Sequence, residues 1–341
     1  MFKINKIKKK FHRTLIVAEI SANHCGSKKN FLHHILKAKE SGADLVKIQT
    51  YEPQDMVVHK NFKIKSGLWK GKNLWSLYKK ACTPFSWHKD AFHLAKKNKI
   101  KLFSSPFSLR SLNFLKTFKP PIYKIASMEL TDHKLVNEIA KLKKTIILST
   151  GLSTINEIKS SINIIKKYHS KIILLYCVSG YPTPINEINF DEIKNIKNKT
   201  KIKHIGFSDH TDGIEASLEA INNNVYLIER HFTLKKNSKS PDIKFSITPS
   251  ELKILKNYSI SKEIFSKKNK GKPSENSSKI FRRSIYALKN INKNEKFSSE
   301  NIGCFRPNIG LGSENYFKVI RKRASKNIKK NEVIRRSFIK K

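Results

Sequence analysis

The sequence is short of cysteine and of long apolar segments, and each shortage excludes a class of protein. Its 341 residues include four cysteines, and no two of them form a CxxC pair. Widely spaced cysteines argue against a disulfide framework and favour a reducing compartment, so we expect a cytoplasmic protein. No apolar run approaches the roughly 18 residues that a membrane-spanning helix needs. We therefore expect no membrane partner.

Acidic residues are also scarce, because 26 Asp and Glu stand against 70 Lys and Arg, for a formal net charge of +44. Such a charge is typical of proteins that bind nucleic acids. The lysines, however, are spread along the whole chain, and Asn and Ile are abundant with them. We interpret the charge as a compositional bias and expect no nucleic-acid partner. A positive field would still attract an anionic substrate.

Short apolar runs that end in polar or reactive residues are the main pattern present. They are Leu15–Ile20, Leu45–Thr50, Ile100–Pro106, Tyr123–Glu129, Thr145–Gly151, Ile172–Gly180, Ile202–His210 and Val225–His231. Helix-like stretches lie between most of them. Eight β-α repeats within about 250 residues are what a (β/α)₈ TIM barrel requires, and such a barrel carries its chemistry at the carboxyl ends of the strands.

The composition changes after the barrel pattern. Residues 267–279 are polar, with Gly, Pro and Ser, which is typical of a linker. Short strand-like pieces with tight turns follow. We therefore predict an α/β barrel domain over residues 1–266, a linker over 267–282 and a small β-rich domain over 283–341.

The connection from Tyr51 to Trp87 is long for a βα loop and holds all three tryptophans. Long loops inside compact domains are often lids or binding loops. Aromatic packing against the mouth of the barrel is the competing explanation. The sequence leaves both open.

His210 and His231 are the candidate metal ligands. They end the last two expected strands, and neighbouring strands bring two imidazoles to one ion with positions left for water and substrate. Oxygen donors would complete a site for Mn²⁺, Mg²⁺ or a related ion such as Co²⁺. For either residue alone, a hydrogen-bonded core histidine is the alternative.

Two lysines and several hydroxyls form a second group at the strand ends. Lysines are costly to bury unpaired, and with hydroxyls they make a cradle for a phosphate or carboxylate. The group comprises Lys47, Lys124, Ser105, Ser127, Ser179 and Ser208. Two alternatives remain: Lys124 as a Schiff-base lysine of an aldolase, and simple ion pairing of the lysines with Glu19 or Glu129.

Three carboxylates lie near the expected mouth. Glu129 stands two residues beyond Ser127 and suits general acid or base work, and Glu19 and Asp242 are the others. Tyr181 and Gln49 suit hydrogen bonds to a polyhydroxylated ligand.

Together these residues resemble the sialic acid synthase family, in which phosphoenolpyruvate is condensed with an amino sugar. The resemblance covers about residues 14–340. Its motifs are AEISANHCGS (18–27), KIQTY (47–51), FSSPF (103–107), YKIASMEL (123–130), LSTG (148–151), YPTP (181–184), SDHT (208–211), ERHF (229–232) and SPDIKFS (240–246). The tail RRSIYALKNINKNE…FRPNIGL resembles the family's antifreeze-like (SAF) domain.

The resemblance implies a role for each candidate residue. His210 and His231 would hold the divalent metal. Lys47, Lys124, Ser105, Ser127, Ser179 and Ser208 would bind phosphoenolpyruvate. Glu129 and Glu19 would be catalytic, Glu129 managing protons, while Glu19, Gln49, Tyr181 and Asp242 would contact the sugar. Arg306 would reach the sugar in a partner subunit's barrel, which implies a homodimer with swapped C-terminal domains.

Within the family, the loop SGLWKGKNLWSLYKKACTPFSWH (66–88), KIAS (124–127) and Ser179 resemble the pseudaminic acid branch. That branch implies metal-dependent condensation of phosphoenolpyruvate with 2,4-diacetamido-2,4,6-trideoxy-L-altrose and water. An N-acetylneuraminate or legionaminic acid synthase is the alternative with the same chemistry. More remote alternatives are the Schiff-base aldolase and a basic nucleic-acid-binding protein without turnover.

Overall fold

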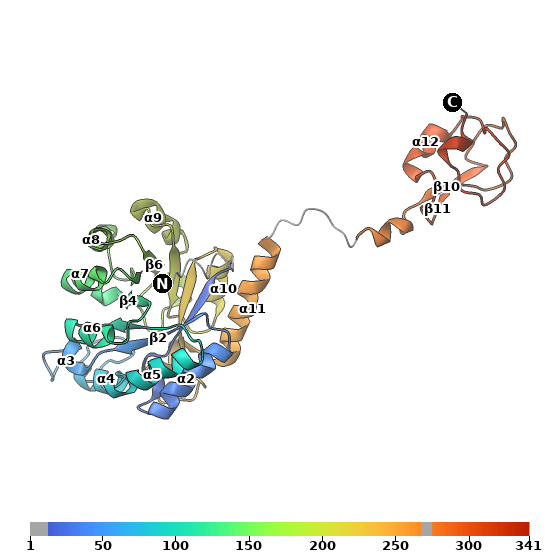
Figure 1. Ribbon diagram of the computed structural model, residues 1–341. Helices are drawn as coiled ribbons and strands as arrows, with labels where there is room; N and C mark the ends of the chain where they lie inside the picture. Colours follow the sequence, from blue (N-terminus) through green and yellow to red (C-terminus); the bar gives the residue numbers. More distant parts are fainter. Residues whose placement is uncertain (1–12, 267–274, 341) are drawn as a thin grey trace. The chain divides into compact units, whose positions relative to one another are not determined.

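The computed structural model describes residues 13–266 and 275–340. The chain divides into two compact units, Met1–Lys267 and Lys268–Lys341 (Figure 1). This division falls inside the segment expected to be a linker. Residues 1–12, residues 267–274 of the predicted linker and residue 341 lie outside the described residues.

The first unit is a closed parallel barrel. Strands pair in sequence order, and β1 returns to β8 with Leu15 opposite Leu227 and Glu19 opposite His231. The strands are β1 (Leu15–Glu19), β2 (Leu45–Thr50), β3 (Leu102–Pro106), β4 (Ile122–Ile125), β5 (Thr145–Ser149), β6 (Ile172–Tyr176), β7 (Ile205–Asp209) and β8 (Leu227–Phe232). A short β9 (Ser246–Ile247) adds to β8. The predicted (β/α)₈ barrel is confirmed.

Helices surround the strands (Figure 1). They are α2 (Lys28–Glu40), α5 (Phe85–Lys97), α6 (Leu109–Lys116), α7 (His133–Lys141), α8 (Ile155–Lys166), α9 (Asp191–Thr200), α10 (Glu215–Asn222) and α11 (Pro249–Ser266). Ser27, Ser108, Asp132 and Thr154 begin four of them by accepting a backbone N–H of the first turn. Because these caps satisfy N–H groups that have no partner within the helix, they fix where each helix starts.

The core has two layers because strand side chains alternate between faces. One layer fills the barrel interior, with Leu15, Val17, Leu45, Phe103, Ile122, Ile147, Ile173 and Leu175. The other lies between strands and helices, with Ile16, Val46, Ile146 and Leu174 among its members. Burial on both faces is what favours apolar residues at successive strand positions.

The long β2–α5 connection is structured. It contains α3 (Pro53–Met56), a hairpin over residues 62–74 and α4 (Leu74–Ala81). In the hairpin, Ile64 N–H donates to Lys72 O at 2.9 Å and Lys63 pairs with Asn73 in antiparallel fashion.

One detail differs from the pattern of apolar runs. β4 ends at Ile125, and Ser127–Glu129 forms a 3₁₀ turn, η2, because Glu129 N–H donates to Ala126 O at 3.2 Å. Of the cysteines, Cys25 is exposed and Cys177 is buried.

The second unit is small and β-rich. Strands β10 (Ser284–Ala287) and β11 (Ile302–Phe305) are antiparallel, and α12 (Tyr316–Val319) lies beyond them. Its core contains Ile285, Ile291, Phe297, Ile302, Val319, Ala324, Ile328 and Ile334.

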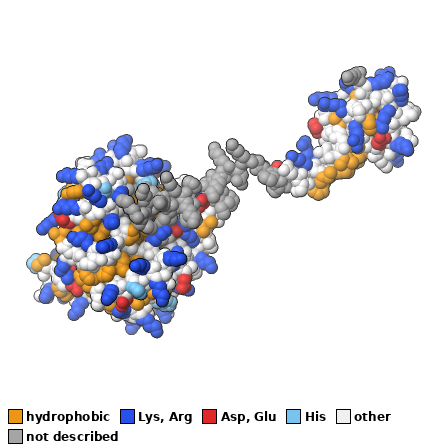
Figure 2. Space-filling view, viewed as in Figure 1, with side chains coloured by type: hydrophobic (Ala, Val, Ile, Leu, Met, Phe, Trp, Pro, Cys, Tyr) orange, Lys and Arg blue, Asp and Glu red, His pale blue; other side chains and the backbone are white. Residues whose placement is uncertain are grey.

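Basic side chains are scattered over the visible face of each unit in Figure 2, among apolar and uncharged ones. Among the described residues, no helix combines the length and apolar character needed to cross a membrane.

Candidate active site

The apolar interior of the barrel ends in a polar layer at the carboxyl ends of the strands. Steps of two residues lead from the apolar layer to this one: Val17 to Glu19, Leu45 to Lys47, Phe103 to Ser105, Ile122 to Lys124, Ile147 to Ser149 and Leu227 to Glu229. All six polar residues are buried. The strand alternation thus brings side chains from six strands to one mouth.

Buried ion pairs hold the centre of this layer. Lys47 Nζ lies 2.6 Å from Glu229 Oε1 and 2.8 Å from Glu19 Oε2. Lys124 Nζ donates to Ser149 Oγ at 2.7 Å and lies 3.9 Å from Glu229 Oε1. The ion pairing with Glu19 that the sequence left open as an alternative is present for Lys47, and Glu229 lies near both lysines.

Burial and charge shift the pKa values of this cluster. Burial lowers the pKa of Lys47 to about 8, although the carboxylate of Glu229 opposes the shift. Burial alone would raise the pKa of Glu229, but the cations of Lys124 and Lys47 outweigh it and lower that pKa to about 2. Glu229 therefore stays ionised and holds the lysine charges in place.

A cradle of small polar groups lies beside the lysines. Ser127 Oγ is 3.0 Å from Cys177 Sγ, which is 3.9 Å from Ser179 Oγ. A Cβ atom on Gly151 would lie 2.3 Å from Ser179 Oγ and 2.7 Å from Cys177 Sγ. The cradle therefore requires glycine at position 151. A cavity of about 440 Å³ lined by Gly151, Cys177 and the start of α8 adjoins it.

The two candidate metal ligands lie side by side, with their ring centroids 5.6 Å apart. His210 Nδ1 lies 3.2 Å from the carbonyl oxygen of Val178. Because a carbonyl can only accept, Nδ1 carries the proton and Nε2 keeps its lone pair. His231 Nδ1 lies 3.4 Å from Asp242 Oδ2. Burial, with the neighbouring His231, lowers the pKa of His210 to about 3, so this ring is neutral, as a metal ligand must be.

The donor set fits a divalent ion completed by other ligands. In residues 13–266 and 275–340, no three His, Cys, Asp or Glu side chains gather as a metal group. The His210 ring, whose Nδ1 is turned to the Val178 carbonyl, matches the arrangement in which an outer acceptor orients a ligating ring, whereas His231 Nδ1 lies beside the Asp242 carboxylate without a hydrogen bond among the described residues. Remaining positions would fall to water and substrate oxygens.

Glu129 lies in η2 beyond β4 rather than at a strand end. Its Oε2 is buried and has no hydrogen-bond partner among the described residues. Burial raises its pKa to about 7, against the opposing effect of Lys124. A carboxyl that titrates near neutral pH suits proton transfer.

The other predicted residues of the barrel also reach the mouth. Gln49 is opposite Ser105 in the β2–β3 register, and Ser208 Oγ donates to Glu229 Oε1 at 3.4 Å. Tyr181 packs on the His210 ring, with centroids 4.4 Å apart. Arg306 belongs to the second unit, where it is exposed.

Two tryptophans of the long segment from Tyr51 to Trp87 lie in different places, one at the mouth of the barrel and one in the core. Trp69 lies with its ring centroid 5.9 Å from that of Tyr181, so the hairpin from β2 reaches the β6 side of the mouth. The indole N–H of Trp69 is buried without a partner among the described residues. Trp87 instead packs against His24 and serves the core.

Sequence reasoning missed Glu229 and Ser149. The alternation of strand side chains could have found both, because each lies two positions after an apolar residue of the barrel interior. It also missed Asp209 and Arg230, whose partnership is visible only when β7 and β8 are placed side by side.

A closed parallel barrel with paired lysines, hydroxyls and histidines at its catalytic end, followed by a small β unit, defines a class of barrel enzymes acting on anionic substrates. The NeuB family model matches residues 34–270, and the SAF domain model matches residues 282–340. The chain belongs to the NeuB family, which confirms the resemblance drawn from the motifs.

Curated relatives are similar over nearly the whole chain. The chain is 39% identical over 331 residues to the pseudaminic acid synthase of Campylobacter jejuni serotype O:23/36 (strain 81-176), covering 95% of this chain and 96% of the relative. It is 37% identical to the pseudaminic acid synthase of Helicobacter pylori, covering 93% and 95%. It is also 37% identical to the N,N'-diacetyllegionaminic acid synthase of Campylobacter jejuni, covering 95% and 99%.

A solved relative shares the fold. The N-acetylneuraminic acid (sialic acid) synthetase of Leptospira borgpetersenii, in complex with citrate, superposes with a TM-score of 0.68 at 29% identity. The match covers 78% of this chain and 90% of that one.

Proposed function

We propose that the chain is a pseudaminic acid synthase, which condenses phosphoenolpyruvate with 2,4-diacetamido-2,4,6-trideoxy-L-altrose and water to give the nonulosonic acid and phosphate. The observation that carries the proposal is the 39% identity to a pseudaminic acid synthase over 95% of this chain. The polar mouth supports it, because it offers cations and hydroxyls for one substrate and hydrogen-bonding groups for the other.

Phosphoenolpyruvate would bind at the lysines and the cradle. Lys47 and Lys124 supply the positive charge, and Ser127 and Ser179 donate hydroxyls around Gly151. Ser105 and Ser208 complete the set. Glu229 keeps the lysines charged and spaced before the substrate arrives, so little reorganisation is needed on binding.

His210 and His231 would hold a divalent ion such as Mn²⁺, Mg²⁺ or Co²⁺. When bound, such an ion polarises a carbonyl oxygen as a Lewis acid. Glu19, Gln49, Tyr181 and Asp242 would contact the sugar. C3 of phosphoenolpyruvate forms a bond to the aldehyde carbon, whose oxygen takes up a proton as its C=O bond opens. Water adds at C2 and loses a proton, and the C2–O bond to phosphate then breaks as the C2 hydroxyl gives up its proton to form the ketone. Glu129 would move the proton that the water loses.

We also propose that the protein acts as a cytoplasmic homodimer with swapped C-terminal units. Arg306 would reach the sugar in the barrel of the second copy. Phe305 and Ile309, on either side of it, are 51% and 53% exposed, so this edge of the small unit offers apolar surface to a partner. The family's downstream glycan would be a surface glycan such as glycosylated flagellin.

Phosphate release with Mn²⁺ tests the function. The assay is run in parallel with the 6-deoxy diacetamido altrose, its legionaminic-type epimer and N-acetylmannosamine. Release with the altrose alone is expected. Release with one of the other sugars instead would make the chain a legionaminic or N-acetylneuraminate synthase, a candidate favoured by the 37% identity to a legionaminic acid synthase.

A chemical test distinguishes the Schiff-base aldolase from the metal-dependent synthase. Borohydride trapping of a substrate adduct at Lys124, together with full activity of His210→Ala, would replace the metal-dependent mechanism by a Schiff base. No release with any sugar would contradict the synthase function altogether.

A further inference from the structure

The ends of β7 and β8 carry two parallel triplets, Ser208-Asp209-His210 and Glu229-Arg230-His231. The strand register sets Ser208 opposite Glu229 and Asp209 opposite Arg230. Because side chains alternate, the first pair faces the barrel interior and the middle pair faces the helix layer. Each candidate metal ligand is therefore the residue immediately after one member of a cross-strand pair.

The middle pair is a buried salt bridge in a layer that is otherwise mainly apolar. Arg230 Nη1 lies 2.6 Å from Asp209 Oδ2, and both side chains are 0% exposed. Outward positions near the ends of most other strands hold apolar residues such as Ala18, Ile48, Ile125 and Leu148, while Thr50 and Ser104 are polar but uncharged. Since an apolar pair of similar volume often serves stability as well, a buried ion pair here calls for another reason.

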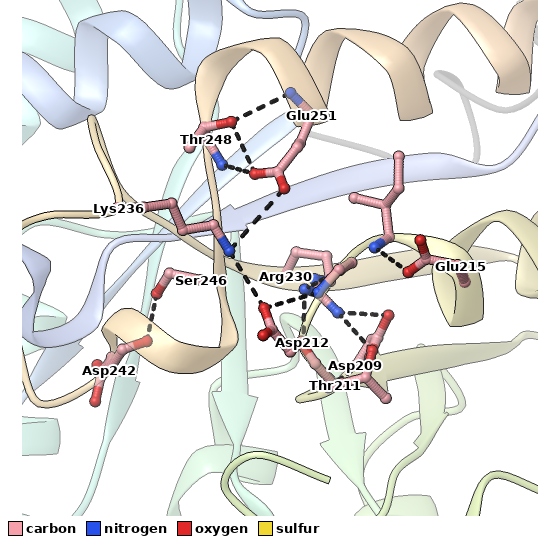
Figure 3. A network of polar contacts seen from close by, with 12 residues as sticks. Asp209, Thr211, Asp212, Glu215, Arg230, Lys236, Asp242, Ser246, Thr248 and Glu251 are labelled. Carbon is pink, nitrogen blue, oxygen red and sulfur yellow. Dashed lines mark hydrogen bonds and ion pairs between the residues drawn. The ribbon is translucent and has the colours of Figure 1, made fainter. Parts of the chain in front are cut away.

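The pair also fixes the backbone that follows His210 (Figure 3). Arg230 Nη2 donates to the carbonyl oxygens of Thr211 and Gly213 at 3.0 and 2.7 Å. Asp209 Oδ1 accepts from the backbone N–H and the hydroxyl of Thr211 at 2.9 and 2.7 Å. The hydroxyl of Ser217, on α10, donates to Asp209 Oδ2 at 2.5 Å. One guanidinium and one carboxylate thus tie together both strand ends, the next loop and a helix.

A second, weaker set of ion pairs holds the same loop from the solvent-exposed side. Lys236 Nζ lies 3.5 Å from Asp212 and 4.0 Å from Glu251 at the start of α11 (Figure 3). Its side chain is 40% exposed, and exposed ion pairs contribute little. The positioning of the strand ends therefore depends mainly on Arg230 and Asp209.

We propose that Arg230 and Asp209 are positioning residues that set the separation and orientation of His210 and His231 for a divalent ion. The inference rests on the proposed two-histidine metal site and deepens it. Neither residue touches the ion. Their ion pair fixes the strand register, and their bonds to Thr211 and Gly213 hold the backbone on the far side of His210. A change at either residue would then alter metal affinity through the backbone.

Titration of the metal-free full-length protein with Mn²⁺, by calorimetry and by the electron paramagnetic resonance of free Mn²⁺, tests this. Arg230→Lys keeps a positive charge but loses the planar fork that reaches two carbonyls. We expect it to weaken Mn²⁺ binding on the order of tenfold, the range found for residues that orient metal ligands. Arg230→Met should weaken binding further, and Asp209→Asn should fall between.

A buried ion pair at the other end of the barrel gives the matched control. Arg13 Nη2 lies 2.6 Å from Asp44 Oδ1, just before β2, with side chains 4% and 9% exposed. Asp44→Asn should lower the thermal midpoint as the Asp209 variant does, yet leave Mn²⁺ affinity unchanged. Phosphoenolpyruvate affinity without metal should stay within about twofold of wild type in folded Arg230→Lys.

The outcomes separate the two proposals. Wild-type Mn²⁺ affinity in folded Arg230→Lys, with binding abolished in His210→Ala and His231→Ala, would overturn the positioning role while keeping the metal site. Failure of the wild-type protein to bind Mn²⁺, or unchanged binding in both histidine variants, would remove the metal site and this inference with it. Equal loss of affinity in Asp44→Asn would assign the effect to general destabilisation.

Discussion

At the scale of single residues, Gly151 is a position in the proposed phosphoenolpyruvate cradle that has no space for a side chain. Gly151→Ala would place a methyl group 2.3 Å from Ser179 Oγ, closer than such atoms approach. The serine must turn away, so the KM for phosphoenolpyruvate should rise at least tenfold while the KM for the sugar changes little. Steady-state kinetics with each substrate varied in turn measure this.

Gly180→Ala is the neighbouring control, because its Cβ would meet nothing nearer than 3.5 Å. It should leave both KM values near those of the wild type. Equal effects of the two substitutions would contradict the cradle assigned to Gly151.

Glu129 predicts a pH dependence of stability. Burial raises its folded pKa from 4.5 to about 7, so the folded protein holds this proton more tightly than the unfolded chain does. The associated stabilisation is complete below pH 4.5 and is lost as the pH rises through 7. Glu129→Gln, which has no charge to bury, should therefore raise the free energy of unfolding by roughly 3 kcal/mol at pH 8 and change it little at pH 4.5.

Urea unfolding of both proteins at the two pH values checks this prediction. Glu138→Gln, on α7, is the control: Lys141 holds the pKa of the Glu138 carboxyl below its usual range, so this substitution should not stabilise the protein at pH 8. A Glu129→Gln effect of the same size at both pH values would mean that the carboxyl is not buried in its charged form.

At the residue level, the sequence predicts a position at the mouth where one strand carries the signal. Lys47 and Lys124 lie within apolar runs, His210 and His231 end theirs, and the barrel places all four at one mouth. Glu229 was overlooked although it also lies on such a strand, because its importance comes from Lys47 on β2 rather than from its own neighbours. Contacts between distant strands arise when the sheet closes into a barrel, and the order of apolar and polar residues along the sequence does not show which strands then meet.

At the scale of elements, the hairpin over residues 62–74 makes its own prediction. Trp69→Phe keeps an aromatic ring against Tyr181 and removes the unpartnered indole N–H. If that group donates to the sugar, the KM for the sugar should rise about tenfold, the size of one lost hydrogen bond, without a change for phosphoenolpyruvate. Initial-rate measurements with the preferred sugar give both constants.

Trp75→Phe is the control within the same connection, since Trp75 lies under Lys60 and not at Tyr181. A sugar KM that stays constant in Trp69→Phe would show that the hairpin only covers the mouth.

Element boundaries were predicted less well than element types. The fourth apolar run continues past Ile125 into Ala126, Ser127, Met128 and Glu129, and backbone hydrogen bonds fold Ser127–Glu129 into η2 instead of extending the strand. The turn moves Ser127 and Glu129 off the strand, so their side chains do not follow its alternation. The helices were easier, because caps such as Thr154 mark their starts.

At the scale of the whole molecule, the swapped dimer predicts complementation. His231→Ala lacks a metal ligand, and Arg306→Ala lacks the arginine that would reach the partner's sugar. Each variant alone should be impaired, the second through the sugar KM. Unfolding and refolding a mixture should restore activity, because a mixed dimer joins an intact barrel to an intact tail.

The mixture is compared with each variant refolded alone at the same total concentration. No gain in activity would place Arg306 at the barrel of its own chain or outside the reaction. The division into two units was visible in the sequence as a change of composition after residue 266, whereas the pairing of units between copies leaves no such pattern.

The charge balance of the mouth has a consequence for how the chain tolerates change. Two buried lysines there lie beside two buried carboxylates, so these four formal charges cancel within a chain of net charge +44. Exposed charges more than about 8 Å away are largely screened by physiological salt. The outer lysines should therefore contribute little to the electrostatics of the buried mouth. Exchanging distant ones for acidic residues should lower the isoelectric point and slow the arrival of an anionic substrate more than it changes the reaction at the mouth.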